Sequence, residues 1–167
     1  MPDIVLKYGT ALTPTVTNLQ SLASSSTFLS GWTSAWIVNT SVLALDYLVT
    51  ANIAAGTSPT AGVVRVYVYA EHADGSTAPS INSGGTPGTQ GAFTITDVEQ
   101  LDASLILMWS SDMDSTTNDN YTMPSRSIAE AFGQVPRRFA FYVTHSSVAA
   151  LRSTLNAIYL DPILNTY

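Results

Sequence analysis

The sequence contains no cysteine, and this absence removes several kinds of chemistry at once. A thiolate nucleophile, a zinc site with cysteine ligands and a disulfide framework are all excluded. The chain of 167 residues can still fold as one domain, because a domain of this size buries roughly two-thirds of its unfolded surface. We therefore expect a fold held by packing and hydrogen bonds alone.

Charge is also scarce. Only 11% of the residues are charged, whereas soluble domains usually carry about 25%. Hydroxyl side chains supply the missing polarity, with 21 threonines and 20 serines, and lysine occurs once, at Lys7. Because lysine and glutamate are depleted from protein–protein interfaces, the composition favours a surface that another protein covers, and we expect a homo-oligomer. The alternative is an acidic monomer that uses hydroxyls for solubility.

The signals for nucleic-acid and membrane partners are missing as well. The net charge is −6, and Arg137-Arg138 is the one basic cluster, whereas binding to phosphates needs a basic stripe. No run of residues approaches the roughly 18 consecutive apolar residues of a transmembrane helix. The first residues lack the cationic and apolar segments of a secretory signal. We expect no nucleic-acid partner, no membrane partner and no targeting segment.

Alternation of apolar and polar residues dominates what is present. This alternation extends over residues 43–50, 63–70 and 138–144, and in the last range Phe139, Phe141 and Val143 are expected to face inward. A repeat of two residues is typical of a β-strand. Further short strands are expected at residues 93–96, 105–109 and 155–160. One helix is predicted, starting with a capping box at Ser127 and ending at Gly133. The pattern indicates an all-β fold, an antiparallel β-sandwich or jelly roll of about seven or eight strands with one short helix.

The composition of two polar segments predicts loops. Residues 71–91 are rich in glycine, serine and proline, and residues 112–124 are rich in aspartate, threonine and asparagine. Structureless loops of this length are uncommon in compact domains and are usually functional or flexible.

The first 26 residues are predicted to form an extended arm, followed by the sandwich in residues 27–167. Alternation of Ile4, Leu6 and Tyr8 indicates a brief strand, and Ser24-Ser25-Ser26 indicates a flexible joint. Such an arm can add itself to the sheet edge of another subunit through main-chain hydrogen bonds. The segment can equally be the first strand of its own sheet.

Catalytic signals are weak. His72 and His145 lie near Asp74 and Ser146 in the sequence, but neither histidine stands in a recognisable nucleophile motif. We expect these histidines to be ordinary surface or strand-end residues, and we expect no enzymatic activity and no cofactor.

One aspartate-rich segment begins like a calcium loop. Asp112 and Asp114 take the first and third ligand positions, but Thr117 replaces the glycine of an EF-hand and Met123 replaces its bidentate glutamate. A looser calcium site that includes Asp119 is the alternative to a plain turn role for these residues, and we predict no metal site.

The aromatic residues allow two interpretations. Three tryptophans and eight tyrosines could form a sugar-stacking platform if they lay exposed in a row. Burial in the core or in a subunit interface is favoured, because Trp109 ends an apolar run and Tyr47 alternates with aliphatic residues.

Several short stretches carry a family resemblance through their order and spacing over residues 20–160. They are Leu22-Ala23-Ser24-Ser25-Ser26-Thr27, Asn39-Thr40, Asp46-Tyr47-Leu48-Val49, residues 56–62, Val66-Tyr67-Val68-Tyr69-Ala70, Ala131-Phe132-Gly133, Pro136-Arg137-Arg138 and Thr144-His145. In this arrangement the chain resembles small virion-associated structural proteins of tailed bacteriophages. The two polar loops match no part of that pattern.

The resemblance implies a jelly-roll structural protein without catalytic residues, such as a capsid decoration or cement protein. The implied partner is the major capsid protein or another virion protein, and the implied location is the virion, after synthesis in the host bacterial cytoplasm. A closed homo-oligomer, most naturally a trimer, would remove free sheet edges.

Two segments are predicted to make the contacts. Their residues are Ile4, Leu6 and Tyr8 in the arm, and Tyr159, Ile163 and Tyr167 in the C-terminal tail. The alternative function is a glycan-binding module of a phage head or tail fibre, which would need an exposed row of aromatic residues.

Overall fold

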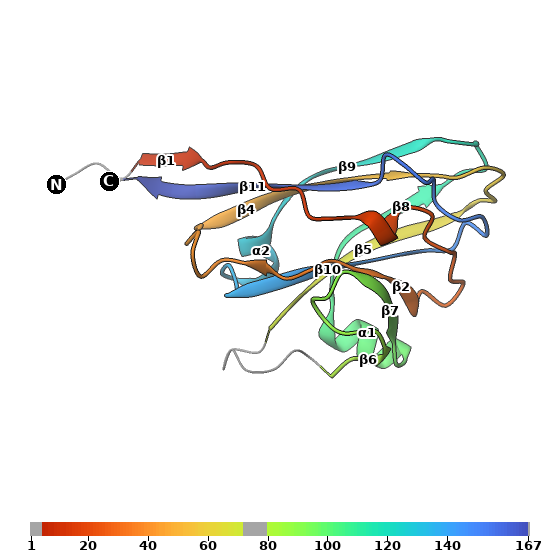
Figure 1. Cartoon of the computed structure of the whole chain (residues 1–167), viewed down its shortest axis with the longest axis horizontal. Helices are drawn as coiled ribbons and strands as arrows, with labels where there is room; N and C mark the ends of the chain where they lie inside the picture. The colour runs from red at the N-terminus through yellow and green to blue at the C-terminus, as the bar shows by residue number, and fades with distance from the viewer. Residues whose placement is uncertain (1–4, 72–79, 167) are drawn as a thin grey trace.

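A computed structural model of the chain describes residues 5–71 and 80–166, and it shows two antiparallel β-sheets packed face to face (Figure 1). The four-stranded sheet consists, in spatial order, of β1 (Val5–Tyr8), β11 (Ala157–Thr166), β4 (Asp46–Ala54) and β9 (Asn120–Ser127). The seven-stranded sheet has the order β6 (Asn82–Gly84), β7 (Gly91–Ile95), β2 (Ser30–Thr33), β10 (Arg138–His145), β5 (Gly62–Ala70) and β8 (Ile106–Met113), with β3 (Ile37–Val38) also paired to β10.

The path of the chain through these sheets is that of a jelly roll. With β3, β6 and β7 set aside, the remaining strands form the sheets β1-β11-β4-β9 and β2-β10-β5-β8. The chain changes sheet at every connection except the one from β5 to β8, which is the order of a double-sheet jelly roll. The predicted all-β sandwich is therefore confirmed. The strand expected at residues 93–96 is β7, whereas β6 and β9 lie in segments that were predicted to be loops.

The central strands β5 and β10 are buried on both faces. In β5, Val64, Val66 and Val68 face the core between the sheets, while Tyr67 and Tyr69 belong to a second apolar cluster on the opposite face. Strand β10 repeats the pattern, and its predicted inward residues Phe139, Phe141 and Val143 all lie in the core. Period-2 alternation places each set on its own face.

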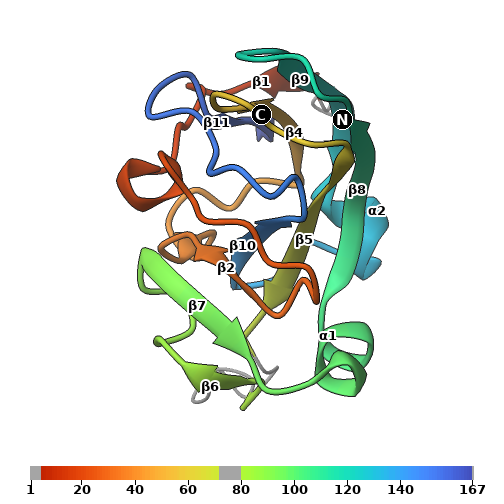
Figure 2. The same ribbon diagram turned by 90° about the vertical axis from the view of Figure 1, so that its right-hand side faces the viewer.

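Helix α1 (Val98–Ser104) covers part of that second cluster and was not predicted (Figure 2). Its N-cap Asp97 accepts a hydrogen bond from the backbone N–H of Gln100 at 2.7 Å, and Leu101 is its buried residue. One buried leucine in seven residues is too little periodicity to indicate a helix.

Helix α2 (Ile128–Phe132) confirms the predicted capping signal. The Ser127 hydroxyl accepts a hydrogen bond from the backbone N–H of Glu130 at 2.9 Å, and Gly133 ends the helix with a left-handed backbone at φ 78°.

Several predicted boundaries were wrong. The strand expected at residues 155–160 runs as β11 from Ala157 to Thr166, and the strand expected at residues 105–109 continues to Met113. The strand expected from residue 43 begins at Asp46, because Asn39 holds the preceding turn through two hydrogen bonds with Ala44 and Leu43 has a positive φ of 52°. The loop expected at residues 112–124 is shorter, because β8 runs to Met113 and β9 starts at Asn120. The sequence did not indicate β9, because most of its side chains are polar. It is an edge strand that is exposed along most of its length.

The N-terminal segment packs on its own molecule. Strand β1 pairs with β11 of the same chain, and a short 3-10 helix (Thr17–Leu19) inserts Leu19 fully into the core. Of the two interpretations of the arm, the structure shows the strand of its own sheet.

Candidate interaction surface

The register of the four-stranded sheet sorts its residues onto two faces. The pairs Ile158 with Ala51 and Leu160 with Val49 are buried against the other sheet. The pairs between them, such as Tyr159 with Thr50, therefore point away from the core, because side chains that are directly opposite share a face.

This outward face collects the apolar residues predicted to make contacts. Tyr8 pairs with Ile163 and Leu6 pairs with Asn165, so β1 adds its leucine and tyrosine to the side that carries Tyr159. Leu6, Tyr8 and Tyr159 are 61%, 66% and 47% exposed, and Ile163 is half-buried. Four of the six predicted contact residues thus lie on one surface, while Ile4 and Tyr167 lie outside the described residues.

Leu48 belongs to the same outward face and was not among the predicted residues. It is half-buried on β4, where it stands opposite Asp161. The sequence did contain a signal for the position of Leu48. Leu48 alternates with the core residues Tyr47 and Val49, so its side chain lies on the opposite face of the strand. We call Leu6, Tyr8, Leu48, Tyr159 and Ile163 the outward patch.

The two sheets differ in how much of their surface the chain covers. The seven-stranded sheet has the core on one face and, on the other, the second apolar cluster, to which Leu101 of α1 belongs (Figure 2). In the part of the chain that the structure describes, no element packs across Tyr8, Tyr159 and Ile163, whereas α2 lies next to Leu48 at the other end of the outward patch. The outward patch is therefore the sheet surface best placed for contact with another protein.

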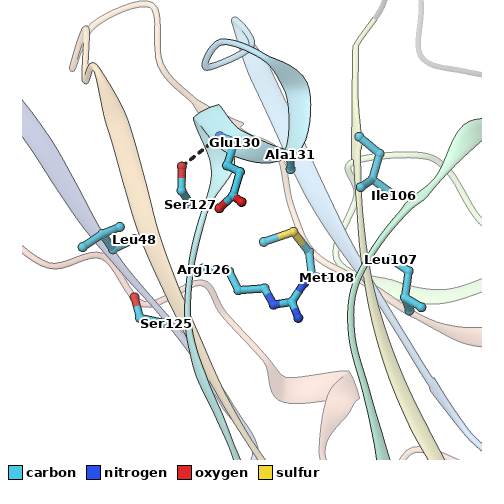
Figure 3. A pocket seen from close by; sticks show the side chains of 9 residues that line it. All are labelled: Leu48, Ile106, Leu107, Met108, Ser125, Arg126, Ser127, Glu130 and Ala131. Carbon is cyan, nitrogen blue, oxygen red and sulfur yellow. Dashed lines mark hydrogen bonds between the residues drawn. The ribbon is translucent and has the colours of Figure 1, made fainter.

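A groove of about 550 Å³ opens between the edges of β8 and β9, next to α2 (Figure 3). Arg126, Glu130 and Met108 extend towards the same space, and Ile106 and Ala131 add apolar walls. Arg126 and Glu130 are its two ionisable lining residues, and they have opposite charges. The groove lacks the convergent set of acid, base and nucleophile that bond chemistry would require.

His145 is buried at the end of β10, although an ordinary strand-end or surface position was expected for it. Its Nε2 donates to the carbonyl oxygen of Leu22 at 3.0 Å, so Nδ1 accepts from the Ser147 hydroxyl at 3.0 Å. Burial lowers the pKa of His145, and the hydrogen bond to Leu22 opposes this shift in part. Ser147 is itself buried, so this serine–histidine pair lies away from the surface and ties the N-terminal segment to the sandwich.

Of the remaining candidates for catalysis, only Ser146 lies in the part of the chain that the structure describes. Ser146 donates no hydrogen bond to His145; its hydroxyl accepts from the backbone N–H of Val63 at 3.0 Å. His72 and Asp74 lie outside the described residues.

The aspartates of the suspected calcium segment serve the β8–β9 turn. Asp114 accepts hydrogen bonds from the Thr116 backbone N–H at 2.7 Å and from the Tyr121 hydroxyl at 3.1 Å, and chiefly the first of these lowers its pKa. Asp119 accepts from the backbone N–H of Asn120 at 2.8 Å. Across residues 5–71 and 80–166, no three His, Asp or Glu side chains gather as a metal-binding group.

The tryptophans are mostly interior. Trp32 and Trp109 are buried in the core, and the Nε1 of Trp109 donates to the Pro124 carbonyl at 2.9 Å, which joins β8 to β9. Trp36 is half-buried against the second cluster and lies under the Arg138 guanidinium, 5.4 Å from it. Among the described aromatics, Tyr8 and Tyr159 are the large exposed ones, and both belong to the outward patch.

The predicted basic cluster is partly neutralised. Arg138 forms an ion pair with Glu71, whose side chain is 3% exposed, and this hydrogen-bonded carboxylate raises the pKa of Arg138. Within the described ranges, no helix has the length and apolar character needed to cross a bilayer.

Comparison of the chain with protein-family models, with curated proteins and with solved structures found no match. The resemblance to phage virion proteins stays a prediction drawn from the residues.

Proposed function

We propose that this protein is a non-catalytic structural protein of a tailed-bacteriophage virion, specifically a capsid decoration or cement protein. The outward patch carries the proposal, because its exposed side chains Leu6, Tyr8 and Tyr159 gather on one sheet face and no described element covers them. The jelly-roll topology is compatible with this role, since viral capsid proteins use it, but lectins and cupins use it too. The exposed surface, rather than the fold, is therefore the argument.

The chemistry of the patch suits attachment to a protein shell. Removing its apolar side chains from water is favourable, and the polar side chains beside them are Thr50, Asn52 and Thr122, with one exposed carboxylate at Asp161 opposite Leu48. Ordering such side chains at a contact costs less entropy than ordering lysine or glutamate. Many modest contacts, repeated over a shell, combine through effective concentration.

The proposed partner is the major capsid protein or another virion protein, and the proposed location is the virion. Copies of the chain are also proposed to associate with each other. The sequence predicts a trimer on a three-fold position of the shell, whereas the outer edge of β1 favours a pair of copies.

Shell binding by surface variants tests the proposal. Tyr159→Asp and Ile163→Asp place a carboxylate in the outward patch, and each is expected to weaken co-sedimentation with shells assembled without the protein by at least 10-fold, about 1.4 kcal/mol. Leu155→Asp is the matched control, because Leu155 is exposed to a similar degree but lies on the loop before β11. Equal binding by all three variants would contradict the assignment of this surface.

A glycan-binding module is the second candidate, because Tyr8 and Tyr159 are exposed on the same sheet face. Stacking of sugar rings on these tyrosines would be lost in a Tyr8→Ala, Tyr159→Ala double variant. Binding to a glycan array that this variant loses would favour the second candidate, whereas shell binding without glycan binding would favour the first.

A further inference from the structure

Among the described edge strands longer than the two-residue β3, only β1 has an unbroken register and no proline. The edge strand β6 has only three residues and a shifted register, β8 has a shifted register beside Tyr67, and β9 has a register shift and Pro124. Shortening, bulges and proline are the features that discourage the addition of a further strand. Strand β1 is also short, with four residues, and it carries Lys7, but it pairs with β11 without interruption and its edge has neither a bulge nor a proline.

The hydrogen-bond pattern shows which main-chain groups face that outer edge. The backbone N–H of Gly9 donates to the Pro162 carbonyl at 2.7 Å, immediately after the pairing of Tyr8 with Ile163. In an antiparallel ladder the direction of the main-chain groups alternates, so Lys7 faces β11 while Leu6 and Tyr8 direct their N–H and C=O groups outward. No described strand lies on that side of β1 (Figure 1).

We propose that β1 of one molecule pairs antiparallel with β1 of a second copy of this chain, across a two-fold axis at Leu6. Such an axis stands perpendicular to the sheet, and it therefore brings residues of the same face opposite one another. The axis can pass through Leu6, Lys7 or Tyr8 within this strand.

Charge and strand length select among these three positions. An axis at Lys7 sets two lysine ammonium groups directly opposite each other, which is destabilising. An axis at Tyr8 keeps only Tyr8 paired within the strand, because Lys7 and Leu6 then face Gly9 and Thr10 of the other copy, whereas an axis at Leu6 keeps Val5, Leu6 and Lys7 paired within it and only Tyr8 faces a residue before the strand. An axis at Leu6 pairs Leu6 with its symmetry mate and Lys7 with Val5 of the other copy, and it uses the outward main-chain groups of Leu6.

The pairing would also extend the outward patch. The four-stranded sheets of both copies become one continuous sheet of eight strands. Leu6 and Tyr8 from each copy lie at its centre, flanked by Tyr159 and Ile163 on either side. This inference deepens the proposed function by naming the contact between copies, but pairing of β1 does not require a shell.

Disulfide trapping tests the register, because the natural chain has no cysteine. In a hydrogen-bonded antiparallel pair the Cα atoms are about 5.5 Å apart, which lies within the range that a disulfide spans. The L6C variant is therefore expected to form a covalent dimer under mild oxidation. The K7C variant is the matched control, because in this register its two Cα atoms are about 8 Å apart, from a rise of about 3.4 Å per residue and a strand spacing of about 4.8 Å.

Light scattering on the unmodified chain gives the second readout. A dimeric mass is expected, Leu6→Val should retain it, and Leu6→Lys should give a monomer with an unchanged circular dichroism spectrum. A monomeric or trimeric mass for the unmodified chain would overturn the proposal. Faster trapping of K7C than of L6C would overturn the register.

Shell binding is measured separately, so that the two proposals fail independently. Tyr159→Asp changes the outward patch but leaves β1 intact, and it should lose shell binding while it stays dimeric. A dimer that fails to bind shells contradicts the proposed function alone.

Discussion

His145 is a buried histidine at the junction between β10 and the N-terminal segment. Burial holds its pKa in the folded protein below the ordinary value of about 6.5. As the pH falls through about 6.5, the unfolded chain takes up a proton before the folded protein does. The contribution of His145 to stability is therefore complete above about pH 6.5 and is lost progressively as the pH falls towards the lower, folded-state pKa.

Chemical denaturation of the natural chain and of His145→Gln measures this effect. We expect the difference in unfolding free energy between the two proteins to shrink between pH 7.5 and pH 5, because the glutamine does not titrate. A constant difference over this range would show that the histidine is not protonated more readily in the unfolded chain.

Gly88 illustrates a residue that is fixed by a close approach. Its φ is 65°, and a Cβ at this position would overlap the ring of Trp36. Gly133 also has a positive φ, of 78°, but nothing lies near the position of its Cβ.

Alanine at the two glycines separates backbone strain from overlap. Gly133→Ala carries only the strain of a left-handed backbone, about 1–2 kcal/mol, while Gly88→Ala adds displacement of Trp36 and should cost about 1–3 kcal/mol more. Thermal unfolding of both variants measures the difference. Equal losses would mean that the Trp36 ring moves aside at little cost.

The N-terminal segment contains two elements with different roles. Strand β1 exposes the side chains of all four of its residues and is held by β11 alone among the strands, whereas the 3-10 helix buries Leu19 completely. Removal of β1 and removal of the whole segment should therefore have different effects.

Two truncations make the comparison. Deletion of residues 2–9 should remove self-association and leave a folded sandwich, whereas deletion of residues 2–20 should also lower the unfolding free energy by about 2–5 kcal/mol through loss of the buried leucine. Leu19→Ala in the full chain should reproduce most of that loss. Equal stability of both truncations would contradict a core role for Leu19.

Among the elements, local signals explain which predictions succeeded. The strands at residues 63–70 and 138–144 have alternating β-branched and aromatic residues, and α2 has a capping serine, so neighbouring residues specify them. Strand β9 and helix α1 lack such signals. Their conformation depends on pairing with β4 and on packing over Leu101, which involve distant parts of the chain.

At the scale of the whole molecule, low charge predicts an association that resists salt. Raising the ionic strength from 0.1 M to 1 M shortens the Debye length from about 10 Å to about 3 Å, which weakens contacts between exposed charges. Apolar contacts are not weakened in this way. Shell binding and the dimeric mass are therefore expected to persist at 1 M sodium chloride.

Sedimentation and light scattering at the two salt concentrations check this expectation. Loss of either association at high salt would indicate that ionic contacts, rather than the outward patch, hold the partners together.

The sequence by itself determined the β-sandwich class, the strands around Val66 and Phe141, and the cap of α2, because each rests on residues close together in the chain. It also grouped Leu6, Tyr8, Tyr159 and Ile163 as contact residues, although it did not place them on a common surface.

The tertiary structure alone decided which face of each sheet is covered. The alternation in β5 marks two faces, yet only packing against Trp36 and Phe93 covers Tyr69, and only the pairing of β1 with β11 aligns Tyr8 with Ile163. These contacts join residues that are far apart in the sequence. A local sequence pattern indicates that a strand has two different faces, but long-range packing determines which part of the chain covers each face.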